Sequence, residues 1–473
     1  MSDLCDRSAV ELAAMIRGRE VSAREVLAAS LQRIAAVNPQ LNAVVTLVPE
    51  LAEQWATAAD DAVARGDDLG PLHGLPVLHK DLEATAGIRT TFGSPLFRDF
   101  VPDVDGSTVE RLRAAGAVTL GKTNTPEFGA GSQTFNSVFG ATRNPYDTGR
   151  TCGGSSGGAA VALSTGMVSI ADGSDMGGSL RNPASFCNLV GLRPSAGRVP
   201  SWPTRTPWSP LPTAGAMART VDDLALQMQA LAGPDPRVPI SLPDHGSVFA
   251  SVIEQPLDDL AELRVAWTPD LGLPTDADVR DALSFVPDRL SDLGCRVSED
   301  APDLSDAGDV FQVLRAWHFE LTAGEWYDRS PDQLKDTVRW NVELARSLDL
   351  TDHARAAARH ADIVERVRRF FERYDVLALP VAQVSPFPVE IEWPTEVEGV
   401  TMTTYIDWMR SCSDISVTGC PAMSMPAGFT PGGLPVGVQF VGRPHGDVEL
   451  LRFAKAWERA VPAGRVRATF DAV

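Results

Sequence analysis

The chain has 473 residues, of which 44% are hydrophobic and 22% charged. This composition supplies a large buried core and excludes a mostly disordered protein. The formal net charge is −20 at pH 7, which repels phosphate backbones and anionic lipid and so argues against nucleic-acid and membrane partners.

Targeting and disulfide signals are missing from the sequence. The first residues have neither the basic start nor the apolar stretch of a signal peptide. The apolar run at residues 159–171 is shorter than a membrane span. The six cysteines lack C-x-x-C spacing, which favours reduced thiols. We therefore expect a cytoplasmic protein.

Two helices are predicted in the N-terminal segment, residues 1–60. Ser8 with Glu11, and Ser22 with Glu25, have the spacing of a capping box. Apolar residues recur at helical spacing after the second box. We expect this segment to pack on the main body or at a dimer contact, without a catalytic role.

Short apolar runs alternate with a helical pattern across residues 75–232. Strands are predicted at 75–80, 117–122 and 168–171, with a helix at 107–115 between the first two. Strands that alternate with helices are typical of an α/β sheet with helices on both faces.

The remaining chain returns to the same pattern after a proline-rich connection at residues 233–262. Strands are predicted at 263–267 and 374–380. The charged stretch between them, about 304–373, is predicted to be mostly helical.

Two glycine-rich turns each contain a serine, Ser155 in residues 153–160 and Ser179 in residues 173–181. A phosphate-binding loop is excluded because neither turn ends in Gly-Lys-Ser/Thr. The first turn fits the Gly-x-Ser-x-Gly elbow of a Ser-His-Asp α/β-hydrolase. However, no downstream histidine has a recognisable catalytic context. That hydrolase, and a turn without chemistry, remain as alternatives.

Lys80, upstream of both turns, completes a pattern that resembles the amidase signature family of Ser-Ser-Lys hydrolases. The resemblance also covers segments nearer the C-terminus: residues 182–195, 215–223, 418–422 and 433–439. It implies an α/β fold with a large central mixed β-sheet flanked by helices on both faces.

The resemblance further implies one domain over residues 1–473. Within it, residues 75–232 hold the catalytic core with the lysine and both serines. Residues 263–473 supply the rest of the sheet, and the helical insertion at about 304–373 shapes the substrate site.

Matching to the family makes Ser179 the nucleophile, Ser155 the bridging serine and Lys80 the general base. A serine hydroxyl needs a base within hydrogen-bond reach. A lysine serves only when neutral, and burial lowers its pKa by penalising the ammonium form. In the family the peptide bond before the bridging serine is cis.

The same match places the oxyanion hole at the backbone amides of four residues: Met176, Gly177, Gly178 and Ser179. Converging N–H groups stabilise the developing oxyanion.

Four further residues are expected to support the catalytic groups. Ser156 and Ser174 would hold the lysine and the bridging serine, and Asp175 would orient the turn. Arg181 would either brace the loop through an ion pair or bind a substrate carboxylate, and bracing is favoured.

The expected reaction is hydrolysis of a carboxamide C–N bond through an acyl-enzyme, without metal or cofactor. Small hydrophobic or aryl amides and anilides are the expected substrates, with carbamates as a further class. Gln133, Thr134 and Phe135 are candidate substrate-binding residues. Two alternatives within the family are the A-type subunit of a glutamyl-tRNA(Gln) amidotransferase and a catalytically silent scaffold. A homodimer is also expected from the resemblance.

Overall fold

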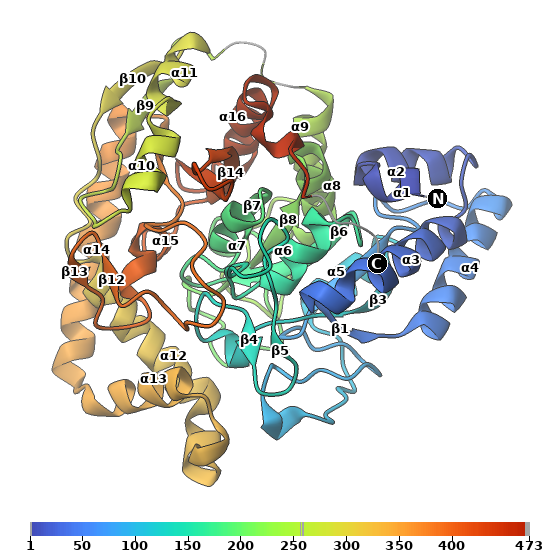
Figure 1. Cartoon of the computed structure of the whole chain (residues 1–473), viewed down its shortest axis with the longest axis horizontal. Helices are drawn as coiled ribbons and strands as arrows, with labels where there is room; N and C mark the ends of the chain where they lie inside the picture. Colours follow the sequence, from blue (N-terminus) through green and yellow to red (C-terminus); the bar gives the residue numbers. More distant parts are fainter. Residues whose placement is uncertain (1, 256, 258–259, 469–473) are drawn as a thin grey trace.

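The computed structural model describes residues 2–255, 257 and 260–468. Within these residues, eleven strands form one mixed sheet surrounded by helices (Figure 1). In sheet order the strands are β1 (Val44–Leu47), β3 (Val118–Thr123), β2 (Pro76–Lys80), β6 (Ile170–Asp175), β8 (Thr213–Ala218), β7 (Val190–Arg193), β14 (Ala422–Phe429), β15 (Pro435–Gly442), β11 (Val376–Pro380), β9 (Arg264–Trp267) and β10 (Arg296–Glu299).

The sheet has parallel strands near both ends and antiparallel strands in the middle. Strands β3, β2 and β6 run parallel, and so do β11, β9 and β10. The strands from β6 to β11 pair antiparallel, and β1 is antiparallel to β3. Two small hairpins lie outside the sheet: β4 (Phe135–Asn136) with β5 (Gly140–Ala141), and β12 (Glu396–Val397) with β13 (Val400–Thr401).

The helices are spread along the whole chain. They are α1 (Ser2–Asp6), α2 (Ala9–Arg17), α3 (Ala23–Leu41), α4 (Pro49–Arg65), α5 (Ser107–Ala114), α6 (Gly157–Ser164), α7 (Arg181–Phe186), α8 (Val221–Leu231), α9 (Ala250–Glu254), α10 (Ala277–Leu283), α11 (Val286–Asp292), α12 (Ala307–Arg329), α13 (Asp336–Ser347), α14 (Leu350–Arg373), α15 (Arg410–Ser416) and α16 (Asp447–Ala460). No helix of the described residues combines the length and the apolar character needed to cross a bilayer.

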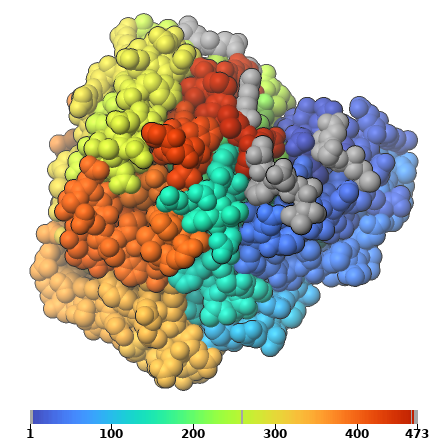
Figure 2. Space-filling view, viewed as in Figure 1, coloured from blue at the N-terminus to red at the C-terminus, as the bar shows by residue number. Residues whose placement is uncertain are grey.

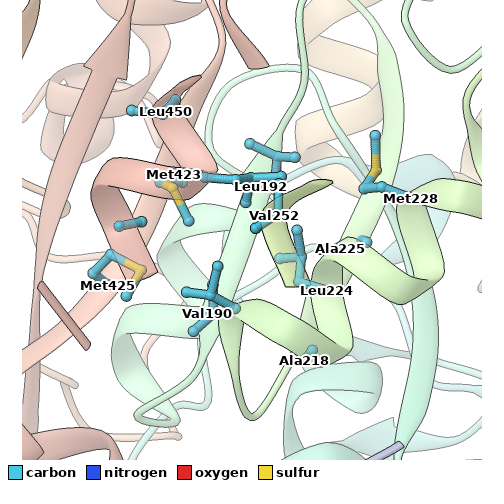
Figure 3. Packing of buried hydrophobic residues seen from close by; sticks show 14 of the residues in the cluster. Val190, Leu192, Ala218, Leu224, Ala225, Met228, Val252, Met423, Met425 and Leu450 are labelled. Atoms are coloured by element: carbon cyan, nitrogen blue, oxygen red, sulfur yellow. The ribbon is translucent and has the colours of Figure 1, made fainter. Parts of the chain in front are cut away.

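Hydrophobic cores lie on both faces of the sheet. In β11, Val376 and Ala378 join a cluster with α8, α9 and α16, whereas Leu377 and Leu379 join one with α12 and α14. Successive strand residues point to opposite faces, so the helices must cover both. Figure 3 shows the first cluster, where side chains of β7 and β14 meet those of α8. The predicted mixed sheet with helices on both faces is confirmed.

Both predicted capping boxes are present at the N-terminus. The Ser8 hydroxyl accepts from the Glu11 backbone N–H, and the Glu11 carboxylate accepts from the Ser8 N–H. Ser22 and Glu25 repeat the arrangement. Each box satisfies two backbone donors that would otherwise lack partners, which explains where α2 and α3 begin.

The segment at residues 233–262 is more structured than a simple connection. A 3-10 helix at Gly246–Phe249 leads into α9, and the side chains of Phe249 and Val252 are fully buried. Both belong to the core cluster that contains α8. The prediction was wrong in this part, because Phe249 and Val252 pack into the core rather than lying in an open connection.

The insertion of α12, α13 and α14 lies on the side of the molecule opposite to α1–α4 (Figure 1). The chain near residue 150 runs between residues near 390 and the N-terminal helices (Figure 2). It is tied to the former by a backbone hydrogen bond of 2.8 Å from Thr151 to Phe387. The sheet takes strands from each predicted segment, and the description as one domain stays a prediction.

Candidate active site

Lys80 lies at the end of β2, in the interior of the protein. Its Nζ is 2.8 Å from the Ser155 Oγ and 3.1 Å from the Ser174 Oγ. Burial lowers the pKa of Lys80 to about 7, against the opposing effect of nearby carboxylates, that of Glu83 first. A lysine with this pKa is half neutral near neutral pH, which a general base requires.

The backbone of Lys80 is fixed by neighbours that the motifs did not reveal. Its N–H donates to one Asp172 oxygen at 2.8 Å, while the other Asp172 oxygen is bonded to His79 Nδ1. His79 Nε2 lies 3.1 Å from the Thr119 hydroxyl. His79, Asp172 and Thr119 come from β2, β6 and β3, so their contacts hold these three parallel strands together behind the lysine.

The first glycine-rich turn places Ser155 just before α6. The Gly154–Ser155 peptide bond is cis, as the family resemblance implied. The next residue, Ser156, exchanges hydrogen bonds with the backbone of Ser174: its hydroxyl donates to the carbonyl at 3.3 Å and accepts from the N–H at 3.4 Å. Its own N–H donates to the Ser179 carbonyl at 3.3 Å. Ser156 therefore joins the two serine turns.

The second turn follows β6 and presents Ser179. This side chain is half-buried, and its hydroxyl makes no hydrogen bond to another group of the described residues. Such a hydroxyl can approach a substrate. The structure brings Lys80, Ser155 and Ser174 into direct contact and ties Ser179 to them through Ser156.

The backbone amides of this turn are not equivalent. The Gly178 N–H donates to an Asp175 oxygen at 2.9 Å, so in this structure it is not directed at a substrate oxygen. The N–H groups of Met176, Gly177 and Ser179 have no such partner among the described residues. In this structure a carboxylate already occupies the Gly178 donor, and the part of Gly178 in the oxyanion hole stays a prediction.

Asp175 and Arg181 form a buried ion pair that holds the turn. The two side chains are 2.9 Å apart, and Arg181 also donates to Gln439 Oε1 at 2.6 Å and to the Ser416 hydroxyl at 2.7 Å. Burial by itself would raise the pKa of Asp175, but the guanidinium groups of Arg181 and Arg193 bring it well below its ordinary value. The contacts of Arg181 are those of a brace, the alternative that the sequence favoured.

Gln133 and Thr134 lie in a loop beside the first serine turn, and Phe135, the third candidate substrate-binding residue, begins β4. The Gln133 amide donates to the Val389 carbonyl at 2.8 Å, and the Thr134 hydroxyl donates to the Gly153 carbonyl at 2.8 Å. Phe135 is half-buried. The first two side chains thus anchor the loop, a role that only long-range contacts reveal. Contact with a substrate stays a prediction.

The chain matches the family described as Amidase over residues 25–451. The chain belongs to the amidase family. This amidase is 34% identical to the acylamidase of Rhodococcus erythropolis over 460 residues, covering 96% of this chain and 95% of that protein. It is also 34% identical to the A-type subunit of the glutamyl-tRNA(Gln) amidotransferase of Carboxydothermus hydrogenoformans over 478 residues, covering 96% of each.

Solved structures agree with these sequence matches. A bacterial aryl acylamidase of the amidase signature family superposes with a TM-score of 0.89 at 27% identity, covering 97% of both chains. A substrate complex of 6-aminohexanoate cyclic dimer hydrolase has a TM-score of 0.87 at 29% identity, covering 99% of both. This amidase is thus a hydrolase of carbon–nitrogen bonds other than peptide bonds.

Proposed function

We propose that this amidase hydrolyses the C–N bond of small hydrophobic or aryl carboxamides, with Ser179 as the nucleophile. One observation carries the proposal: the buried amine of Lys80, whose pKa falls to about 7, lies 2.8 Å from the Ser155 hydroxyl. A neutral amine at this distance can accept a proton from Ser155, which would in turn accept one from Ser179.

The reaction would begin with attack of the Ser179 oxygen on the amide carbonyl. The N–H groups of Met176, Gly177 and Ser179 would stabilise the oxyanion, each donor contributing about 10²–10³ in rate by analogy with other hydrolases. The proton taken up by Lys80 would return through Ser155 to the leaving amine. Water would then attack the acyl-enzyme and lose a proton through Ser155 to Lys80. The proton would return to the Ser179 oxygen as the acid is released.

The remaining polar residues would keep these groups in place. Ser174 holds the lysine amine at 3.1 Å, and Ser156 couples the two turns. The Asp175–Arg181 pair would fix the turn without touching the substrate, because the guanidinium is already bonded to protein groups. Holding the reacting groups in a fixed geometry accounts for much of the rate enhancement of enzymes.

The test is an assay of primary amides, anilides and aryl carbamates, with products identified by mass spectrometry. Ser179→Ala should abolish turnover without lowering the free energy of unfolding. Ser169→Ala is the matched control, because this buried hydroxyl has no hydrogen-bond partner among the residues that the structure describes. Turnover by Ser179→Ala at the wild-type rate would refute the nucleophile assignment.

A second candidate is the A-type subunit of an amidotransferase, favoured by the relative from Carboxydothermus hydrogenoformans that matches 96% of this chain. Such a subunit would release ammonia from glutamine only together with its partner subunits. Activity of the isolated protein on anilides, unchanged when those subunits are added, would exclude it.

A further inference from the structure

Buried arginine side chains of this protein differ in what balances their charge. Among the described residues, the buried arginines are Arg181, Arg193, Arg198, Arg219 and Arg315. The first three pair with carboxylates, and Arg219 donates to two backbone carbonyls. Arg315, which is only 3% exposed, has neither kind of partner. Fully buried arginines are rare unless they are paired.

The partners of Arg315 are weak and neutral. Its Nε donates to the Tyr405 hydroxyl at 2.8 Å and its Nη1 to the Met176 sulfur at 3.2 Å. The guanidinium also lies over the rings of Phe319 and Tyr405, at 4.8 and 5.4 Å. A guanidinium has five N–H donors, and only two are bonded to groups of the described residues. The aromatic faces compensate part of its charge.

Tyr405 adds a further donor at the same place. Its oxygen also accepts from the Asn341 amide at 2.7 Å, so both of its lone pairs are used. Its own O–H finds no acceptor in the described part of the chain. The centroid of the Trp393 ring lies 6.3 Å from that of the Tyr405 ring, and the buried Trp393 Nε1 has no hydrogen-bond partner within residues 2–255, 257 and 260–468. The Arg315–Tyr405 pair therefore offers donors and lacks an acceptor.

This pair lies against the candidate active site. Met176, which touches Arg315, opens the turn that carries Ser179. One helical turn before Arg315, Phe311 packs on the next residue of the Ser179 turn: a Cβ added to Gly177 would come 2.6 Å from its Cζ. This part of α12 therefore forms a wall beside the proposed oxyanion hole.

A second path leads from the other catalytic serine. A Cβ added to Gly129 would lie 3.4 Å from the Ser155 Oγ, and one added to Gly131 would lie 3.9 Å from the Tyr405 ring. The loop at residues 129–131 thus spans from Ser155 to Tyr405. Each proposed catalytic serine is therefore connected to the Arg315–Tyr405 pair by a short segment: Ser179 by its own turn, and Ser155 by the loop at residues 129–131.

We propose that Arg315 and Tyr405 bind a carboxylate of the substrate, so that this enzyme acts on amides that carry a carboxylate close to the scissile bond. The guanidinium fork matches a carboxylate, and the phenol O–H supplies another donor. The nearby Lys335 is not assigned this role, because its Nζ forms an ion pair with the Glu392 carboxylate at 2.7 Å. The inference rests on the proposed function and names its substrate class.

The test compares each acid with its methyl ester, which keeps the shape but removes the charge. One pair is 4-acetamidobenzoate and its ester, with the carboxylate on the amine side. The other is glutaryl-4-nitroanilide and its ester, with the carboxylate on the acyl side. The wild type should prefer the acid of at least one pair. Arg315→Gln should lower kcat/KM for that acid about 10- to 100-fold, mainly through KM.

The ester provides the internal control. Arg315→Gln should change its kcat/KM by less than about threefold, because the ester has no anionic group for the guanidinium to bind. Tyr405→Phe should act in the same direction with a smaller effect, and Arg315→Lys should restore part of the preference. Arg329→Gln, at an exposed position on the same helix, should leave kcat/KM unchanged for both the acid and the ester.

Equal losses for acid and ester would show that Arg315 is only structural, and a wild type that prefers both esters would also overturn the inference. If neither pair is turned over, binding of 4-acetamidobenzoate and glutarate to Ser179→Ala is measured by calorimetry. Binding that weakens at least about tenfold in the double variant with Arg315→Gln supports the inference, and no binding overturns it. Turnover that depends on Ser179 without acid preference refutes this inference alone, whereas turnover without Ser179 refutes the proposed function.

Discussion

The turn that carries Ser179 and the helical insertion beside it both bury an arginine, in very different surroundings. Arg181 lies against Asp175 at 2.9 Å and makes further hydrogen bonds to Gln439 and Ser416. Arg315 has a phenol, a thioether and aromatic rings. A fully paired charge fixes geometry, whereas a charge with unused donors is suited to bind a ligand. The paired arginine supports the turn proposed to carry the chemistry, and the arginine with unused donors lies in the insertion for which we propose a role in specificity.

The largest expected effect comes from removing the base of the catalytic core. Lys80→Met should lower kcat/KM by about 10³-fold or more, because Ser179 would lose its route for proton transfer. Lys122→Met is the control: this lysine is also buried, but its amine donates to the Glu83 backbone carbonyl and the Thr85 hydroxyl rather than to a serine. It should lower stability and leave most of the activity. An equal loss of activity in both variants would contradict the role of Lys80.

The paired charges of the core should contribute more to stability than those of the insertion. Asp175→Asn should lower the free energy of unfolding by about 3–5 kcal/mol, because two buried guanidinium groups lose their anion. Arg346→Gln removes exposed pairs of the insertion with Glu320 and Asp328 and should cost less than about 1 kcal/mol. Urea denaturation measures the free energy of unfolding of both variants. Similar losses would show that the core pairs do not stabilise the protein more than those of the insertion.

The depressed pKa of Asp175 also sets a pH dependence. Because its folded pKa lies below the unfolded value, its stabilisation is complete above the ordinary pKa of an aspartate. The stabilisation is lost as the pH falls through the lower, folded value.

The pH profile should sharpen the assignment of the base. Since Lys80 must be neutral to act and its pKa is about 7, kcat/KM should fall about tenfold per pH unit below that value and level off above it. The free energy of unfolding should rise with pH, whereas a lysine whose pKa is raised by a paired carboxylate would make it fall. The unfolded chain keeps its proton up to about pH 10.4, so the free energy of unfolding should rise between about pH 7 and that value.

The difference between wild type and Lys80→Met isolates this contribution in both measurements. A rate profile without an inflection near neutral pH, or a stability difference that is constant across this range, would show that Lys80 stays charged.

The smallest effect is expected at a helix end in the insertion. The Asp349 carboxylate caps α14 by accepting from the Asp352 N–H at 2.9 Å. Asp349→Ala should lower Tm by about 1–3 °C without changing kcat, because one helix cap is lost. Asp362→Ala, at an exposed position within the same helix, should shift Tm by less than about 1 °C. A loss of activity in the Asp349 variant would show that the insertion does more than hold the substrate.

Interactions between neighbours in sequence could be predicted, and those between distant residues could not. The capping box of Ser22 and Glu25 and the strand that ends at Lys80 follow from local patterns. The contact of His79 with Asp172, and of Arg315 with Tyr405, joins residues about ninety positions apart. Nothing in either local sequence marks its partner, because the packing of the sheet and its helices brings them together.

The Gly178 amide illustrates a second limit. The glycine-rich turn indicated a group of converging N–H donors, but only the position of the Asp175 side chain shows which donor is already used. Composition likewise misled at residues 233–262, where prolines suggested an open connection and the buried Phe249 belongs to the core. In both cases the deciding contact is made by a side chain whose direction the sequence does not specify.

The bond between Arg181 and Gln439 has a consequence for how the enzyme is made. Gln439 lies on β15, 258 residues after Arg181 in the chain, yet it holds the turn that carries the candidate nucleophile. During translation that brace forms only after β15 has left the ribosome. A nascent or prematurely ended chain therefore carries both serines without the support that would make them reactive.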